Sequence, residues 1–128
     1  MSDELFDKGM ATRKAVLGEA YVARAEANKT DFDADWQRYV TEHAWAAVWT
    51  RPGLEKRTRS MLTIAMLASL GRLDELGAHI RATRNTGVTK DEVKEVLLQV
   101  AVYAGAPAAN SAFAIAKRVY KEMESESK

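Results

Sequence analysis

The sequence predicts an all-α fold, a single domain built as a bundle of about six to seven helices. Good helix formers such as alanine, leucine, glutamate, lysine and arginine are frequent, whereas the 128 residues include only 7 glycines and 2 prolines. No run of alternating polar and apolar residues is long enough to indicate a strand. The length suits one hydrophobic core, so we expect one domain over residues 1–128 with a polar tail, about 122–128, that frays.

Three helices are expected in the first part of the chain. The first covers about residues 4–16, and a second, short helix covers about residues 19–27. Thr30 and Asp31 offer side-chain oxygens that can cap the start of a third helix, which then runs to about Ala44.

Four more helices are expected after the Pro52-Gly53 break. Gly71 is a natural left-handed end for the first of them, and Pro107 suits the first turn of the last. Thr89 and Glu92 have the spacing of a capping box, which predicts a helix start between them. The expected ranges are about 55–70, 73–85, 89–103 and 107–122.

Two of these helices predict self-association. Residues 61–70 contain only Thr63 and Ser69 among apolar or small side chains, and the helix over 93–103 is apolar on more than half of its circumference. A small domain cannot easily bury two such helices by itself, and exposed apolar patches of this size usually mark subunit contacts. We therefore expect a homo-oligomer.

Composition excludes several classes of function. The 19 Lys+Arg residues balance 18 Asp+Glu residues, so no nucleic-acid partner is expected. The absence of cysteine removes disulfides, zinc–thiolate sites, iron–sulfur clusters and thiol redox chemistry. The longest apolar stretch, residues 61–70, is too short for a bilayer, and the acidic N-terminus is unlike a signal peptide. We expect a soluble, cytoplasmic protein without a membrane partner.

No motif for a phosphate loop, a metal-binding histidine pair or a nucleophile elbow is present in the sequence. What remains is cofactor-free acid–base chemistry on a carboxylated small molecule, without a metal, or no chemistry at all.

A candidate catalytic face lies on the helix predicted over residues 73–85. Helical spacing places Arg72, Glu75 and His79 together, beside an apolar stripe. A carboxylate four residues before an imidazole can bind it and raise its pKa, which would make His79 a proton donor or acceptor near neutral pH. The alternative interpretation is an ordinary surface pair of little energetic consequence. The stripe consists of Leu73, Leu76 and Ile80.

A second candidate region is the segment HAWAAVWTRPGL, residues 43–54. It holds His43 together with Trp45 and Trp49, which are two of the three tryptophans in the chain. The two indoles can form a corner of the core, or they can form one wall of a site for an anionic ligand. Spacing alone leaves both interpretations open.

Arginines in and after this segment add positive charge. Arg51 precedes a proline, which favours extended backbone, and a guanidinium held in this way suits a carboxylate ligand. Arg57 and Arg59 follow in the next predicted helix. We interpret Arg57 as ordinary solvated charge, whereas Arg59 can contribute to the same positive field.

The combination of HAWAAVWTRPGL, RTRSMLTIAML, ELGAHIRA and NTGVTKDEVKEVLLQVAVYAGAPAANSAFAIA resembles the gamma-carboxymuconolactone decarboxylases of the protocatechuate branch of the beta-ketoadipate pathway. The resemblance extends over nearly the whole chain, including GMATRKAVLG near the N-terminus. The first block is specific to that family, whereas the helical remainder is shared with the alkyl hydroperoxidase D superfamily. The resemblance implies an alkyl hydroperoxidase D-like fold and a hexamer.

The superfamily comparison also implies which chemistry is absent. Peroxidase-type members carry Cys-x-x-Cys-x-x-x-His, and aligning that histidine with His79 puts Arg72 and Glu75 at the two cysteine positions. A peroxidase or disulfide reductase activity is therefore excluded, because neither side chain can supply a thiolate.

The family reaction implied is cofactor-free decarboxylation of 4-carboxymuconolactone, a dicarboxylate lactone, to beta-ketoadipate enol-lactone. The conjugated lactone carbonyl takes up the electrons, so no organic cofactor is needed. Under this resemblance His79 transfers the proton and Glu75 orients it. Two rival hypotheses are a related thiol-free enzyme on another carboxylated lactone or keto acid, and a non-catalytic oligomeric helical protein. The residues expected to bind substrate are Arg51, Arg59, Arg72, His43, Trp45 and Trp49.

Overall fold

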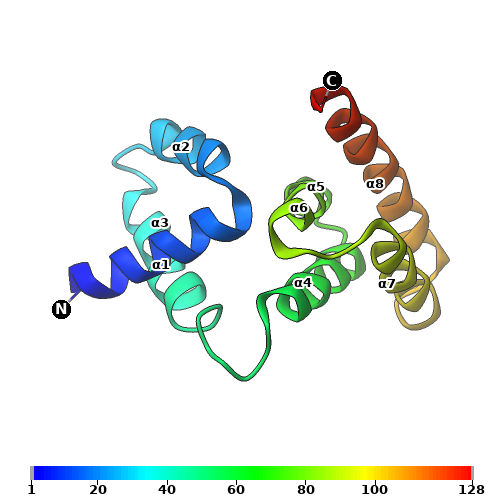
Figure 1. Cartoon of the computed structure of the whole chain (residues 1–128), viewed down its shortest axis with the longest axis horizontal. Helices are drawn as coiled ribbons and strands as arrows, with labels where there is room; N and C mark the ends of the chain where they lie inside the picture. The colour runs from blue at the N-terminus through cyan, green and yellow to red at the C-terminus, as the bar shows by residue number, and fades with distance from the viewer. Residues whose placement is uncertain (1, 128) are drawn as a thin grey trace. The chain divides into compact units, whose positions relative to one another are not determined.

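A computed structural model describes residues 2–127, and it confirms the all-α prediction, because these residues form helices and no strand (Figure 1). The helices are α1 (Ser2–Leu17), α2 (Glu19–Asn28), α3 (Ala34–Val40), the π-helical segment η1 (Thr41–Ala46), α4 (Lys56–Leu70), α5 (Leu73–Arg81), α6 (Thr83–Thr86), α7 (Lys90–Tyr103) and α8 (Ala106–Glu126).

Contacts within the chain define two compact units, one ending at Lys56 and one beginning at Arg57. We call them the N-terminal and the C-terminal unit and describe each by itself. A single domain over the whole chain stays a prediction.

The N-terminal unit is organised by the packing of α1 on η1. Gly9 makes this approach possible, because a Cβ atom at this position would overlap the carbonyl oxygen of Thr41. Thr41 is fully buried, and its hydroxyl donates a 2.7 Å hydrogen bond to the carbonyl of Gln37. A small residue on α1 therefore fixes how closely η1 can lie.

The predicted third helix differs from the structure at both ends. It begins at Ala34, because Asp33 closes a turn by accepting a 2.8 Å hydrogen bond from the backbone N–H of Thr30. The predicted caps at Thr30 and Asp31 are therefore wrong. Beyond Val40 the helix widens into η1, and π-helical turns of this kind are found frequently at functional sites.

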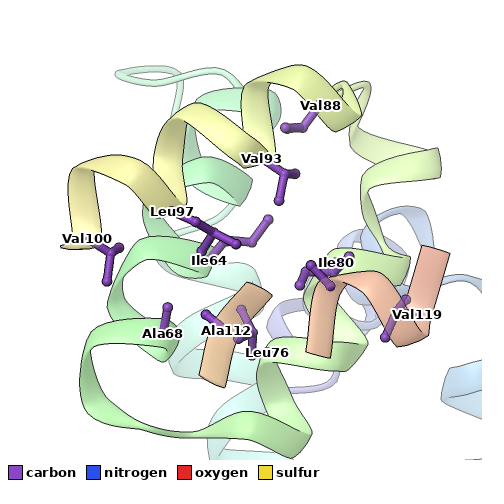
Figure 2. Close-up of a cluster of buried hydrophobic side chains, with 11 residues drawn as sticks. Ile64, Ala68, Leu76, Ile80, Val88, Val93, Leu97, Val100, Ala112 and Val119 are labelled. Atoms are coloured by element: carbon purple, nitrogen blue, oxygen red, sulfur yellow. The ribbon is translucent and has the colours of Figure 1, made fainter. Parts of the chain in front are cut away.

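The C-terminal unit surrounds one apolar core, to which α4, α5, α7 and α8 each contribute side chains (Figure 2). Ile64, Leu76, Ile80 and Leu97 are fully buried, so α5 is held with one face inside the unit and the other available for polar residues. The buried cluster is Ile64, Ala68, Leu76, Ile80, Val88, Val93, Leu97, Val100, Ala112, Ala116 and Val119.

The predicted capping box of α7 is confirmed. Thr89 Oγ1 accepts the backbone N–H of Glu92 at 3.1 Å, and the Glu92 carboxylate accepts the backbone N–H of Thr89 at 2.9 Å. The expected helix over 73–85 is instead divided into α5 and α6, with Gly87 in the left-handed conformation after α6 at φ 84°.

The last helix extends beyond its predicted end near residue 122, to Glu126. Arg81 explains the extension, because it binds the carboxylates of Glu122 and Glu126 at 2.7 and 2.6 Å. The predicted fraying tail included Lys128, which lies outside the described residues.

Apolar side chains also remain at the surface of the C-terminal unit. Leu62, Met66 and Leu70 follow one another at four-residue spacing on α4, and Val102 and Tyr103 near the end of α7 are 75% and 83% exposed. These exposed side chains agree with the apolar character noted for residues 61–70, whereas self-association stays a prediction. Among residues 2–127, no helix is long and apolar enough to cross a membrane.

Candidate active site

His79 lies in the last turns of α5, and burial dominates its environment. Its neighbours Leu76 and Ile80 are fully buried and hold α5 against α8. The imidazole is itself mostly withdrawn from water, and this desolvation lowers the pKa of His79 from 6.5 to about 4. The predicted rise in pKa is therefore wrong, and the ring is neutral near pH 7.

Glu75, the expected partner of His79, does not offset this desolvation. Its side chain is exposed, and it takes part in no hydrogen bond or ion pair within residues 2–127. A carboxylate in water one turn away is too well screened to hold a proton on a desolvated ring. Both carboxylate and imidazole lie on α5 as expected, but the hydrogen bond between them is not formed.

Arg72 occupies a different position from the one that helical spacing predicts. It precedes α5 at the N-cap position, with φ −88° and ψ 76°, so its backbone is not helical. Its side chain is exposed. A face shared with Glu75 and His79 therefore does not follow from the 100° spacing of a helix.

Two arginines on α4 differ in their surroundings. Arg57 forms an ion pair with Glu92, whose second oxygen caps α7, and its side chain remains 40% exposed, which agrees with our interpretation of Arg57 as a solvated charge outside the site. Arg57 thereby ties the start of α4 to the start of α7. Arg59 is half-buried, with its Nε atom fully withdrawn from solvent.

The tryptophans of the 43–54 segment are buried. Trp45 and Trp49 stack with ring centroids 5.0 Å apart, and at 7% and 9% exposure they belong to the core. His43 is exposed, and its ring lies 4.4 Å from that of Tyr39. These observations favour the interpretation of the segment as a structural corner, whereas its role as a ligand wall stays a prediction.

Arg51 is the exposed cation that follows this corner. Its backbone N–H donates a 3.0 Å hydrogen bond to the carbonyl of Val48, which closes a turn directly after Trp49. Arg51 and the aromatic corner belong to the N-terminal unit, whereas Arg59, Glu75 and His79 belong to the C-terminal unit. Their convergence on one cavity stays a prediction.

Sequence reasoning missed Arg13, a buried guanidinium on α1. It is 6% exposed, donates a 3.3 Å hydrogen bond to Gln37 and lies 4.0 Å from a carboxylate oxygen of Glu26. Its Nε atom is buried without a hydrogen bond among the described residues. The signal was available, because Arg13 has the same helical register as Gly9 and the buried Val16.

Within residues 2–127, no group of three or more His, Cys, Asp or Glu side chains could hold a metal ion.

One family model and several known proteins match this chain. The model of the carboxymuconolactone decarboxylase family matches residues 34–118, which extend over parts of both units. A 4-carboxymuconolactone decarboxylase of Acinetobacter baylyi is 48% identical over 124 residues, covering 96% of this chain and 92% of the relative. A nitrosuccinic acid decarboxylase of Metarhizium robertsii is 41% identical over 119 residues, covering 93% and 83%. An uncharacterized 15.0 kDa protein of Paracoccus denitrificans is 36% identical over 89 residues, covering 68% and 66%.

Proposed function

Because this chain belongs to the carboxymuconolactone decarboxylase family, we propose that it decarboxylates 4-carboxymuconolactone to beta-ketoadipate enol-lactone in the catabolism of aromatic compounds. The observation that carries the proposal is the near-complete coverage of a relative with that activity in its name. The all-α fold agrees with the alkyl hydroperoxidase D-like architecture that the family resemblance implies.

The reaction sets three demands on the protein. The bond between the ring carbon and the departing carboxylate breaks, and its electron pair moves through the conjugated double bond to the lactone carbonyl oxygen. Carbon dioxide leaves, and a proton is added to the carbon next to that carbonyl. The enzyme must therefore hold a dianion, stabilise negative charge on the lactone oxygen and supply a proton to carbon.

His79 is proposed to transfer the proton. Its low pKa leaves the ring neutral in the free enzyme. A dianion bound nearby raises the pKa of a desolvated imidazole, because an opposite charge favours the protonated form. Substrate binding would thus load the ring with the proton that is later given to carbon. Glu75 is proposed to orient the ring once substrate is bound, since its carboxylate lies one turn earlier on α5 and has no other partner among the described residues.

Arginines and indoles are proposed to hold the substrate. Arg51 and Arg72 are exposed cations that can bind a ligand as it arrives from solvent. Arg59 is half-buried, which suits it to bind a substrate carboxylate that is withdrawn from water. Arg57 is not assigned a role, because Glu92 already neutralises it. Trp45 and Trp49 would exclude water from the departing carboxylate, with His43 at the edge of the same segment.

The assembly is proposed to be a homo-oligomer, and by family resemblance a hexamer. The apolar stripe of Leu62, Met66 and Leu70 supports it, because a row of exposed large side chains is unfavourable in water. Light scattering on the purified protein tests the number of copies. A cytoplasmic location also stays a prediction.

The test of function is an ultraviolet assay with freshly prepared 4-carboxymuconolactone on the wild type and on His79→Ala. The expected result is turnover by the wild type and a loss of about 100-fold or more in the variant. Arg51→Gln should also lower turnover, because it removes a proposed substrate contact; Arg24→Gln is its matched control, because both arginines are exposed in the N-terminal unit. Absence of turnover, or faster decarboxylation of nitrosuccinate, would contradict the proposed substrate. An unchanged rate in His79→Ala would remove His79 from its role.

A further inference from the structure

Helices α7 and α8 pack against each other in the C-terminal unit (Figure 1). A cavity of about 380 Å³ is lined by residues of these two helices. Its volume falls within the range of cavities that hold small molecules. Every residue that lines it belongs to the C-terminal unit, and neither His79 nor Glu75 is among them. The cavity is therefore distinct from the residues assigned to decarboxylation.

The inner surface of this cavity is apolar and aromatic. Val93 and Leu97 from α7 and Ala116 from α8 form a buried floor. The rings of Phe113 and Tyr120 add flat walls. A surface of this kind favours the body of an apolar, planar ligand and gives little to a fully hydrated ion such as phosphate.

The rim of the cavity is positively charged. Four lysines lie there in two pairs with four-residue spacing, against the two carboxylates of Asp91 and Glu124, so the lining has a net positive charge. Like charges at this spacing destabilise a helix, and the apolar floor gives them no internal counter-ion. The lysines are Lys90 and Lys94 on α7 and Lys117 and Lys121 on α8.

The pair on α8 is the one available to a ligand. Lys90 Nζ lies 5.3 Å from the centroid of the Tyr120 ring, and Lys94 Nζ lies 3.9 Å from Asp91. Lys117 and Lys121 are exposed and take part in no ion pair within residues 2–127. An anion bound above the floor could therefore form ion pairs with both Lys117 and Lys121.

We propose that this cavity is a second binding site, specific for an aromatic carboxylate. The apolar floor receives the ring, and the lysines of the rim bind the carboxylate. The proposal is independent of the decarboxylase assignment, because it uses none of the same residues.

The test is calorimetric titration of the full chain with 2-naphthoate and with its neutral analogue 2-naphthamide. For a ligand of this size the dissociation constant of 2-naphthoate is expected to be on the order of 1 mM or lower. The amide keeps the apolar body and loses the charge, so it should bind about tenfold more weakly. Equal affinities for the two, or no binding of 2-naphthoate, would overturn the proposal.

Charge variants and mapping locate the binding. Lys117→Gln with Lys121→Gln should weaken 2-naphthoate binding about tenfold, at roughly threefold for each exposed charge contact. Lys8→Gln with Lys56→Gln removes two exposed lysines elsewhere and should leave the affinity unchanged. Amide shifts in nitrogen-15 spectra should concentrate in residues 90–97 and 113–124. Shifts concentrated on α5 instead, or equal binding of inorganic phosphate, would refute an aromatic carboxylate site here.

Discussion

Protonation of His79 should make the protein less stable as the pH falls below 7. Folding lowers the pKa of this imidazole from 6.5 to about 4. Between pH 6.5 and about 4 the ring is therefore protonated in the unfolded chain but mostly neutral in the folded chain. The contribution of the neutral ring is complete above pH 6.5 and is lost as the pH falls toward 4. By pH 5 this linkage lowers the free energy of unfolding by about 2 kcal/mol relative to pH 8.

The measurement is urea denaturation at pH 8, 7, 6 and 5, followed by far-ultraviolet circular dichroism. Carboxylates also titrate toward the acid end, so the quantity to compare is the slope of unfolding free energy against pH in wild type and in His79→Gln. The variant should lose about 2 kcal/mol less than the wild type between pH 8 and 5. His43→Gln is the matched control, because it removes the exposed imidazole and should leave the slope of the wild type.

Parallel slopes for the wild type and His79→Gln would refute this reasoning, because they would mean that the imidazole is as well solvated in the folded state as in the unfolded chain. A wild type that gains stability as the pH falls would restore the original prediction of a raised pKa. That outcome would also require a carboxylate close to the ring, for which Glu75→Gln would be the next variant.

Three further predictions concern packing, capping and charge. Gly9→Ala should destabilise the N-terminal unit by about 2 kcal/mol or more, because the added Cβ meets the backbone of Thr41. The control is Gly53→Ala, whose added Cβ enters open space and should change stability little. Thermal unfolding of the two variants tests this difference. Thr89→Ala removes the capping box of α7 and should cost about 1 kcal/mol in urea denaturation, with a cost near zero contradicting the role of the cap. Arg81→Gln should speed amide hydrogen exchange in residues 122–126, because it removes the ion pairs that hold the last turn of α8. It should lower overall stability by less than about 1 kcal/mol, because the carboxylate partners of Arg81 are solvent-exposed. Unchanged exchange would show that the last turn of α8 does not depend on Arg81.

Local chemistry made much of the fold predictable. Gly71 and the Thr89–Glu92 box mark helix ends through their own backbone and side-chain atoms, so their effect can be read without knowing the neighbours. The π-helical turn at Thr41 and the close approach of α1 to it at Gly9 were not predictable, because that contact joins residues far apart in the chain. The length of α8 likewise depends on Arg81, which lies forty-one residues before Glu122 in the chain.

The positions of some candidate site residues were predictable, whereas their electrostatics were not. Helical spacing correctly put Glu75 and His79 on α5, but the sign of a pKa shift depends on which side chain is desolvated. The sequence separated Arg57 from Arg59, but it could not identify the ion-pair partner of Arg57, because Glu92 comes from α7.

The neutral resting state of His79 accords with the proposed chemistry better than the expected Glu75–His79 hydrogen bond does. A carboxylate bonded permanently to the ring would hold a proton there before substrate arrived. A desolvated ring without that charge is neutral at rest, and the weak screening around it makes its pKa sensitive to an incoming anion. The same burial that lowers stability in acid would then couple proton uptake to substrate binding. With this coupling, kcat/KM should fall about tenfold per pH unit between about 6 and 8, because the ring is neutral in the free enzyme and must take up a proton when the substrate binds; a kcat/KM that does not change with pH in this range would contradict His79 as the proton donor.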